Sequence, residues 1–367
     1  MRLTCRRSLR QFCNFIRNKK SYNLRCFSIT CILACLLVYT IVYVILFDRT
    51  VIDTQYVNAV DESVLNNRVD FHEVSIVRSC SNLTRRCYSV RDRKMLSDNG
   101  EEIVERHLLV DGFTDDSDTV VRLIPPNGET FDTSDTRIWV VDHSTIRSDY
   151  VAAMLVAPFL MTSLSLDSKD SGKHVLGIGL GGGSFDMALH KMKREVNITI
   201  VELDPVVVDI AQSWFGVMES KNHHVIVDDG LKFVEKASKS GAKFDVIVLD
   251  ACDEAIKSPC PPATFRNKNV IEMMKGVLTP TGSLLVNILS EDGDGVPSSV
   301  LEIVSLFASV FPACVQMKMV REVNVILACV PYSISNIRQQ LNFYNSRLAT
   351  IAEKFKFAKL LEGVSLV

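Results

Sequence analysis

The sequence predicts an α/β fold in which alternating strands and helices build a largely parallel sheet. Three observations indicate it. From residue 174 onward, β-branched runs alternate with helical stretches. The first of these strands leads into a glycine-rich turn, and acidic residues stand at the ends of the next strands. Parallel strands joined through helices require right-handed crossovers, so the pattern predicts a helix-covered sheet.

We assign this sheet to residues 144–334. The expected strands are His174–Gly179, Asn197–Leu203, His224–Val227, Phe244–Asp250 and Ser283–Leu289. The expected helices are Ser184–Lys193, Pro205–Phe215, Leu231–Ser238, Asn267–Val277 and Val300–Phe311. Two further runs, Cys314–Met319 and Val323–Val330, are close enough to form a terminal antiparallel hairpin. Residues 335–367 are expected to hold a C-terminal helix over Ser335–Phe355.

Residues 71–143 predict a small antiparallel β subdomain ahead of this sheet. Short apolar runs separated by turn-forming residues indicate its strands, which we expect at Val74–Val77, His107–Val110, Val120–Ile124 and Ile138–Val141. The apolar stretch Asp149–Leu164 predicts a helix that Pro158 kinks. Residues 48–70 are polar and are expected to form a stalk.

An uncharged apolar run of residues 27–47 follows a basic tail, residues 1–26. A helix of this length spans roughly 31 Å, the thickness of a bilayer core. Soluble core helices of this length are rarely apolar all round, and a cleaved signal peptide has a shorter apolar core and a small-residue cleavage site. We therefore expect a single N-terminal transmembrane helix, an uncleaved signal anchor. The basic flank predicts a cytosolic tail and a body in the lumen of the endomembrane system.

The cysteines are compatible with that placement. Six lie in the body of the chain, namely Cys80, Cys87, Cys252, Cys260, Cys314 and Cys329. An even number permits disulfides in an oxidising compartment, and buried free thiols are the equal alternative. Cys80 and Cys87 flank a short loop and are the best candidate pair. The loop holds Asn82-Leu83-Thr84, an N-glycosylation acceptor if it faces the lumen. A second such sequence, Asn197-Ile198-Thr199, leads into an expected core strand.

Charge and metal-ligand patterns exclude some classes of function. The tail carries eight of the 41 basic residues and no acid, which leaves 33 basic residues against 43 acidic ones elsewhere. An acidic body gives no support for a nucleic-acid partner. The cysteines and histidines show no zinc-site spacing. His223 and His224 are adjacent, and on a strand they would point to opposite faces, so we assign no metal.

The glycine-rich turn Gly179-Leu180-Gly181-Gly182-Gly183 is the strongest chemical signal. Glycines permit a tight turn and a close approach of the backbone to a ligand, and the amides that open the next helix favour an anionic group. Glu202 ends the next expected strand, about where a ribose-binding carboxylate stands in a Rossmann unit. Together these features predict a nucleotide-type cofactor.

Two more acidic positions follow expected strands. Asp228 and Asp229 follow the third strand, and Asp250 ends the fourth. Ligands of open α/β sheets bind above these strand ends, so the carboxylates are expected to converge on one crevice. Asp229 is expected to accept a hydrogen bond from an adenine amino group, and Asp250 to lie nearest the reacting centre. Asp228 is better interpreted as a solvated turn residue.

Six blocks over roughly residues 110–335 resemble the spermidine synthase-like branch of class I methyltransferases. They are GLGGGSF, VELDPVVVDIAQSWFG, VDDGLKFV, FDVIVLDACD, SPCPPATF and LTPTGSLLVNIL. The resemblance implies a Rossmann-like seven-stranded sheet with a terminal antiparallel hairpin and S-adenosyl-L-methionine as cofactor. Proteins of this family are often dimers, so a homodimer is one expectation for this chain. It further implies that Gly179, Gly181 and Gly183 line the methionine moiety, that Glu202 holds the ribose and Asp229 the adenine, and that Asp250 faces the acceptor.

The favoured activity is methyl transfer to an amine of a protein or peptide, with Asp250 orienting the acceptor and taking its proton. Two alternatives stay open: a spermidine synthase-like aminopropyltransferase, and an inactive, membrane-anchored Rossmann interaction module. Spermidine synthase has an aspartate where this chain has Gly182, and a Tyr-Gln pair where this chain continues from Tyr150 into Val151. Asp250 and Asp253 are retained, but the polar pair that grips a polyamine is missing.

Overall fold

The computed structural model describes residues 72–97, 100–112, 119–253, 258–289, 298–335 and 337–367. Phe71–Val367 forms one compact unit, and only this unit is described below. The expected tail, transmembrane segment 27–47 and stalk 48–70 lie outside the described residues. Within the described ranges, none of the helices combines the length and the apolar character needed to span a bilayer.

The first layer is a five-stranded antiparallel sheet in which each strand pairs with the next along the chain. Its strands are β1 (Glu73–Cys80), β2 (Cys87–Leu96), β3 (Glu102–Val110), β4 (Thr119–Ile124) and β5 (Val140–Ile146). The prediction of a small antiparallel β subdomain is confirmed. It missed β2, whose many charged residues hide the alternation. It also placed the last strand too early, because Thr136–Ile138 forms a 3-10 helix and the strand begins at Val140.

The second layer is an eight-stranded mixed sheet with the order β13-β11-β12-β10-β9-β6-β7-β8. Its strands are β6 (His174–Ile178), β7 (Asn197–Glu202), β8 (His223–Val227), β9 (Phe244–Leu249), β10 (Leu278–Ile288), β11 (Ala313–Lys318), β12 (Val325–Val330) and β13 (Ser365–Leu366). The strands from β6 to β10 are parallel, and β11 and β12 form the expected antiparallel hairpin. The Rossmann-like α/β fold is thus confirmed. The expected seven strands become eight, because the two-residue β13 pairs with β11.

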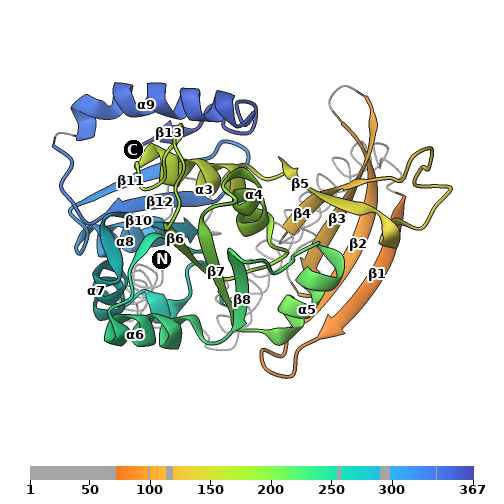
Figure 1. The fold of residues 1–367 in the computed structure, drawn as a ribbon, viewed down its shortest axis with the longest axis horizontal. Helices are drawn as coiled ribbons and strands as arrows, with labels where there is room; N and C mark the ends of the chain where they lie inside the picture. The colour runs from red at the N-terminus through yellow and green to blue at the C-terminus, as the bar shows by residue number, and fades with distance from the viewer. Residues whose placement is uncertain (1–71, 98–99, 113–118, 254–257, 290–297, 336) are drawn as a thin grey trace, which may run out of the picture. The chain divides into compact units, whose positions relative to one another are not determined.

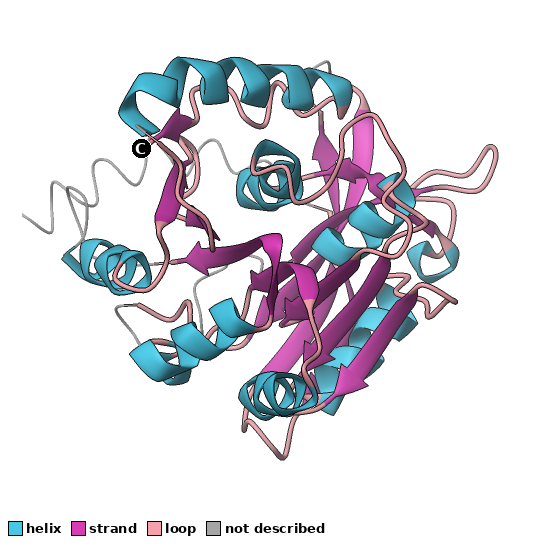
Figure 2. Ribbon diagram, turned by 60° about the vertical axis from the view of Figure 1, so that its left-hand side comes forward, coloured by secondary structure: helices cyan, strands magenta, loops and turns pink. Residues whose placement is uncertain are grey.

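Helices cover both faces of this sheet (Figures 1 and 2). One face packs against α3 (Asp149–Leu160), α4 (Ser184–Met192) and α9 (Ile337–Lys354). The other packs against α6 (Gly230–Ser240), α7 (Lys268–Gly276) and α8 (Ser298–Ala308). Pro158 lies in the last turn of α3, which ends four residues before the predicted Leu164. Both faces are therefore buried, which agrees with the apolar runs in the central strands.

The two sheets meet at α5 (Pro205–Trp214), which lies between them in Figure 1. Side chains of β2, β3 and β4 form an apolar cluster with α5 and with Phe215, the residue that follows it. Arg106 of β3 is buried and holds Asp92 of β2 through two hydrogen bonds of 2.7 Å. The same guanidinium donates to the carbonyl of Trp214, at 2.8 Å. A paired, fully bonded buried charge thus fixes the end of α5 to the small sheet.

All six cysteines in the described part of the chain are paired. Cys80–Cys87 joins β1 to β2, and Cys314–Cys329 joins β11 to β12. Cys252–Cys260 joins the segment after β9 to residues 259–262, a proline-rich segment. Of the two alternatives for the body cysteines, disulfides are therefore the one that the structure contains.

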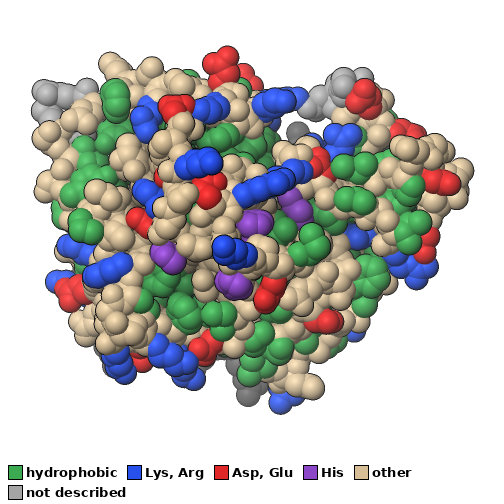
Figure 3. Space-filling model, viewed as in Figure 1, with side chains coloured by type: hydrophobic (Ala, Val, Ile, Leu, Met, Phe, Trp, Pro, Cys, Tyr) green, Lys and Arg blue, Asp and Glu red, His purple; other side chains and the backbone are tan. Residues whose placement is uncertain are grey.

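Acidic and basic side chains are interspersed on the face of the molecule shown in Figure 3, and histidines gather there over β5, α4 and β8. His223 at the start of β8 is buried, and its Nε2 lies 2.6 Å from Oδ2 of Asp186 in α4. Its neighbour His224 is exposed. Burial lowers the pKa of His143 in β5 and of His190 in α4. Burial therefore favours the neutral form of His143 and of His190.

Candidate active site

The carboxyl ends of the parallel strands form one edge of the large sheet, and the predicted site residues lie along it. The glycine turn follows β6, Glu202 is the last residue of β7, Asp229 follows β8, and Asp250 follows β9. Because β9, β6, β7 and β8 are direct neighbours in this order, these segments are brought to one side of the sheet. This is where open α/β sheets bind their ligands.

The glycine turn is shaped by contacts with its neighbours. Gly179 has φ +99°, and a Cβ there would lie 2.2 Å from the carbonyl oxygen of Asp250. Gly182 is enclosed by the small sheet and the end of α5, since a Cβ would lie 2.6 Å from Cγ2 of Thr119 and 2.8 Å from Cδ1 of Phe215. Gly181 and Gly183 also have positive φ, and Gly183 is the N-cap of α4. The turn therefore directs the start of α4 and its amides toward the strand ends.

Two main-chain amides hold the Glu202 carboxylate. Leu180 in the glycine turn donates its amide to Oε2 at 2.9 Å, and Asp204 donates its amide to Oε1 at 2.9 Å. The side chain is only half-buried. Its carboxylate is thus fixed against the glycine turn, and its role as a ribose-binding group stays a prediction.

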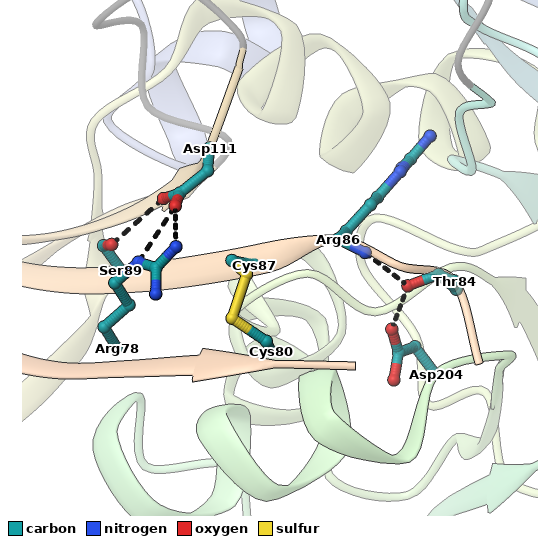
Figure 4. The surroundings of a disulfide bond; sticks show 8 residues. All are labelled: Arg78, Cys80, Thr84, Arg86, Cys87, Ser89, Asp111 and Asp204. Carbon is teal, nitrogen blue, oxygen red and sulfur yellow. Dashed lines mark hydrogen bonds and ion pairs between the residues drawn. A yellow bond between two sulfur atoms is a disulfide. The ribbon is translucent and has the colours of Figure 1, made fainter. Parts of the chain in front are cut away.

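A disulfide-closed hairpin supports this arrangement from the small sheet (Figure 4). Thr84, in the turn between Cys80 and Cys87, donates its hydroxyl to Oδ2 of Asp204 at 2.7 Å, and Tyr88 donates to the same oxygen at 3.0 Å. Burial and the Asp204 charge raise the pKa of Tyr88 to about 12, so its hydroxyl keeps its proton. Asp204 also caps α5 through the amide of Val206. Through Asp204, the hairpin therefore holds the segment that carries Glu202, and we call this contact the hairpin clamp.

Asp229 has a structural task besides its predicted one. Its Oδ1 accepts hydrogen bonds from the amides of Leu231 and Lys232, which makes it the N-cap of α6. Its Oδ2 lies 3.8 Å from Nζ of Lys232. Asp228 accepts from Nζ of Lys236 at 2.8 Å, which agrees with a turn residue at the surface.

Three residues that the sequence analysis missed lie next to the expected cofactor groups. Leu203 and Val227, at the ends of β7 and β8, are apolar yet 48% and 50% exposed. Ser184, the first residue of α4, has a buried hydroxyl oxygen with no hydrogen-bond partner among the described residues. Exposed apolar surface and an unpaired buried oxygen are both typical of a ligand-binding surface. An apolar residue directly after a strand-end carboxylate is the signal that identifies Leu203.

Asp250 is held by side chains. Asn287 of β10 donates its amide to Oδ1 of Asp250 at 2.8 Å. Asn324, just before β12, in turn donates to Oδ1 of Asn287 at 2.9 Å. The sequence analysis missed both asparagines, although a polar residue inside the apolar run Ser283–Leu289 is a visible signal for the first.

The proline-rich segment, residues 259–262, lies near Asp250 in the chain and is tied to the strands beside it. Cys260 is bonded to Cys252, two residues after Asp250, and bridges to Leu289 at the end of β10. Asp253 accepts a hydrogen bond from the amide of Ala263 at 2.8 Å. Asp253 thus helps to hold this loop.

Comparison with known proteins bears on this domain. Residues 158–337 match the spermine/spermidine synthase domain, so the resemblance to spermidine synthase-like proteins seen in the sequence is confirmed for this part of the chain. The eEF1A lysine and N-terminal methyltransferase homolog of Drosophila melanogaster is 28% identical over 233 residues, 63% of this chain and 33% of that protein. The polyamine aminopropyltransferase of Vibrio vulnificus (strain CMCP6) is 33% identical over 130 residues, 35% of this chain and 42% of that protein. The chain thus matches less than half the length of either relative.

Solved structures share the fold. A probable spermidine synthase from Corynebacterium glutamicum ATCC 13032 superposes with a TM-score of 0.52 at 14% identity, over 80% of this chain and 94% of that one. Human methyltransferase-like protein 13 in complex with SAH gives a TM-score of 0.48 at 24% identity, over 59% of this chain and 93% of that one. The first of these supports the fold assigned above.

Proposed function

We propose that this protein is an S-adenosyl-L-methionine-dependent methyltransferase acting on an amine of a protein or peptide. The observation that carries the proposal is the juxtaposition, on a spermidine synthase-like domain, of the glycine turn, Glu202 and Asp250 at one sheet edge. The eEF1A methyltransferase homolog among the curated relatives supports methyl transfer to a protein amine.

The residues present fit this cofactor. Glu202 would hold the ribose hydroxyls, and the exposed Leu203 and Val227 offer apolar surface for the adenine ring. Gly179, Gly181 and Gly183 have positive φ and form the tight turn that would face the methionine moiety, where the unpaired hydroxyl of Ser184 offers a polar contact. Asp229 would reach the adenine amino group through Oδ2, since Oδ1 caps α6.

When bound, the cofactor would supply a sulfonium methyl group to an amine aligned with the C–S bond: the N–C bond would form, the C–S bond would break, and its electron pair would stay on the sulfur of the departing thioether. The amine must be neutral to attack, and desolvation at the sheet edge lowers its pKa. Asp250 would orient the amine and accept the proton that the product ammonium loses. Alignment of the reacting groups supplies most of the acceleration.

The structure disfavours aminopropyl transfer. Spermidine synthase has an aspartate where this chain has Gly182, and Thr119 and Phe215 leave no room for any side chain there. The position after Tyr150, where spermidine synthase has a polar partner, is Val151, which is buried in the core. A diamine needs several carboxylates to hold two ammonium groups, and these positions supply none.

Calorimetric titration of the purified full-length chain tests the proposal. We expect it to bind S-adenosyl-L-methionine, and to bind the decarboxylated form more weakly. Preference for the decarboxylated form would favour aminopropyl transfer instead. If neither binds, the proposal is wrong and the inactive Rossmann interaction module becomes the better interpretation.

We also propose that residues 27–47 anchor the chain in an endomembrane and that the body lies in the lumen. Three disulfides support an oxidising compartment, because such bonds are rare in the cytosol. Asn82 is exposed in the turn between Cys80 and Cys87 and suits a glycan. Asn197, at the start of β7, is only partly exposed.

Expression in a secretory-competent cell tests this placement. Endoglycosidase treatment should increase the gel mobility of the wild type but not that of Asn82→Gln, and the body should resist protease in intact vesicles. An unmodified Asn82 together with protease sensitivity would place the body in the cytosol. A homodimer, expected from the family, stays a prediction that light scattering can check.

A further inference from the structure

We propose that Asn287 is a positioning residue that fixes Asp250 for the acceptor, and that Asn324 fixes Asn287 in turn. The inference rests on the proposed function, because it gives the acceptor carboxylate its orientation. It concerns two side chains from β10 and from the turn before β12, neither of which is part of the expected cofactor site.

The first link determines which way the Asp250 carboxylate faces. Asn287 is 3% exposed, and its amide group donates to Oδ1 of Asp250 at 2.8 Å. Asp250 directly follows β9, and Asn287 lies on the neighbouring parallel strand β10, so the pairing of the two strands sets the separation of their backbones. A hydrogen bond to one carboxylate oxygen, made by a buried donor on a strand, fixes the plane of the carboxylate.

The second link determines which way the Asn287 amide faces. Its Oδ1 accepts from Nδ2 of Asn324 at 2.9 Å, while its Nδ2 donates to Asp250. A rotated amide would set an oxygen against the carboxylate and an NH2 group against the Asn324 amide, so only one orientation satisfies both contacts. The two asparagines therefore act as one directional chain that ends on Asp250.

The outer end of this chain is braced. Asn324 follows Arg321 and Glu322 in the turn between β11 and β12. Glu322 accepts the amides of Asp149 and Tyr150 at the start of α3, both at 2.8 Å, and Arg321 holds the Asp149 carboxylate through two hydrogen bonds. These contacts fix the turn to α3 and so restrain the backbone that carries Asn324.

This arrangement has an electrostatic consequence. A hydrogen bond donated to a carboxylate favours its charged form. Asn287 should therefore keep Asp250 ionised and ready to accept a hydrogen bond from the incoming amine. Without that donor, the pKa of Asp250 should rise, and the carboxylate should rotate among several orientations. A residue that only filled space would affect stability without moving the titration of Asp250.

The test compares Asn287→Ala, Asn287→Ser and Asn324→Ala in the full-length chain with Asn222→Ala, which removes an asparagine contact to the carbonyl of Arg194 away from the strand-end site. For Asn287→Ala we expect kcat to fall roughly 10- to 100-fold, as for loss of a hydrogen bond to a charged group. The acidic limb of its pH–rate profile should move to higher pH, while cofactor affinity stays unchanged. Asn324→Ala should give a smaller change in the same direction, and Asn222→Ala none.

A second readout does not depend on turnover. The Asp250 carboxyl carbon, labelled with ¹³C and assigned with Asp250→Asn, can be titrated by NMR in the wild type and in Asn287→Ser, the milder change should Asn287→Ala fail to fold. We expect a higher pKa in the variant. Superimposable titrations would overturn the inference even if methyl transfer is found. A shifted titration in a chain without methyltransferase activity would support the relay and reject the proposed function separately.

Discussion

The two carboxylates of the candidate site are held by different kinds of group. Glu202 accepts main-chain amides, from Leu180 and from Asp204. Asp250 accepts a side-chain amide, from Asn287, which is itself held by Asn324. Main-chain donors are present whatever the side chains are, whereas side-chain donors disappear with a single substitution. The proposed cofactor side around Glu202 is therefore held by the main chain, and the proposed acceptor side around Asp250 is held by a particular side chain.

The difference indicates where activities can diverge on this scaffold. The contact between the glycine turn and Glu202 is made by the main-chain amide of Leu180, so it does not depend on which side chain stands at that position. Substitution of Asn287 would remove the contact to Asp250 without touching Glu202. Function on a shared fold is thus set by a few side chains next to the reacting centre.

The largest expected effect separates the two carboxylates. Asp250→Ala should lower methyl transfer by about 10²–10⁴-fold, the contribution of a positioned acid or base, with cofactor affinity largely kept. Glu202→Ala should instead weaken cofactor binding by roughly 10- to 100-fold, because hydrogen bonds to a charged group are lost. Calorimetry and single-turnover rates measure the two effects separately.

Asp253→Asn serves as a control, because Asp253 holds the proline-rich loop through Ala263. It should change both quantities less than either alanine variant. Unchanged turnover in Asp250→Ala would remove the role assigned to that residue, and unchanged affinity in Glu202→Ala would remove the ribose contact.

The local signals explain what the sequence could predict. The glycine turn lies directly after β6, and Glu202 and Asp250 stand at the carboxyl ends of β7 and β9. Each of these signals is local to a short segment, so the sequence pattern alone predicts the sheet and the positions of both carboxylates. The roles of these residues, and the domain boundaries, stay predictions. Main-chain contacts such as Leu180 to Glu202 come with the fold once the turn is recognised.

The missed features depend on partners that are distant in the sequence. The sequence of β2 looks like a polar, exposed stretch, because its Asp92 is buried only through its ion pair with the buried Arg106 of β3. No local pattern in the sequence marks Asn324. Its contact with Asn287 becomes visible only when β10 and β12 are paired in the antiparallel part of the sheet. Strand β13 has two residues, which is too short for any periodicity.

An intermediate effect is expected at the hairpin clamp. Thr84→Val keeps the shape of the side chain and removes the hydroxyl that donates to Asp204, so the free energy of unfolding should fall by about 1–2 kcal/mol. Cofactor affinity should fall a few-fold, less than in Glu202→Ala, because the amide of Asp204 still reaches Glu202. Chemical unfolding and calorimetry measure the two changes.

Two matched variants separate the hydroxyl from the glycosylation sequence that contains it. Thr84→Ser keeps both, and Asn82→Gln removes only the sequence, so each should bind the cofactor like the wild type. Equal affinity in Thr84→Val and Thr84→Ser would show that the hairpin does not support the Glu202 segment.

The smallest expected effect is a pH dependence of the free energy of unfolding, which should come from the histidines around α4 and not from the residues around Asp250. Burial lowers the pKa of His143 and of His190 below the ordinary 6.5. Asp186 opposes this shift for both, while Lys191 adds to it for His143, and His223 and Arg194 add to it for His190. These histidines pack around α4, the helix that begins at the glycine turn. We therefore expect a fall in pH to destabilise the part of the fold that carries the proposed cofactor site.

The sign follows from proton binding. Below about pH 6.5 the unfolded chain takes up protons that the folded histidines resist, so the free energy of unfolding should decline as the pH falls through this range and be unaffected well above it. Denaturant unfolding between pH 5 and 8 should show a shallower decline in His143→Gln and His190→Gln. Exposed His174→Gln, and Asn287→Ala on the acceptor side, should keep the wild-type slope between pH 5 and 6.5. Equal slopes in all variants would mean that the histidines around α4 do not make the cofactor side sensitive to acid.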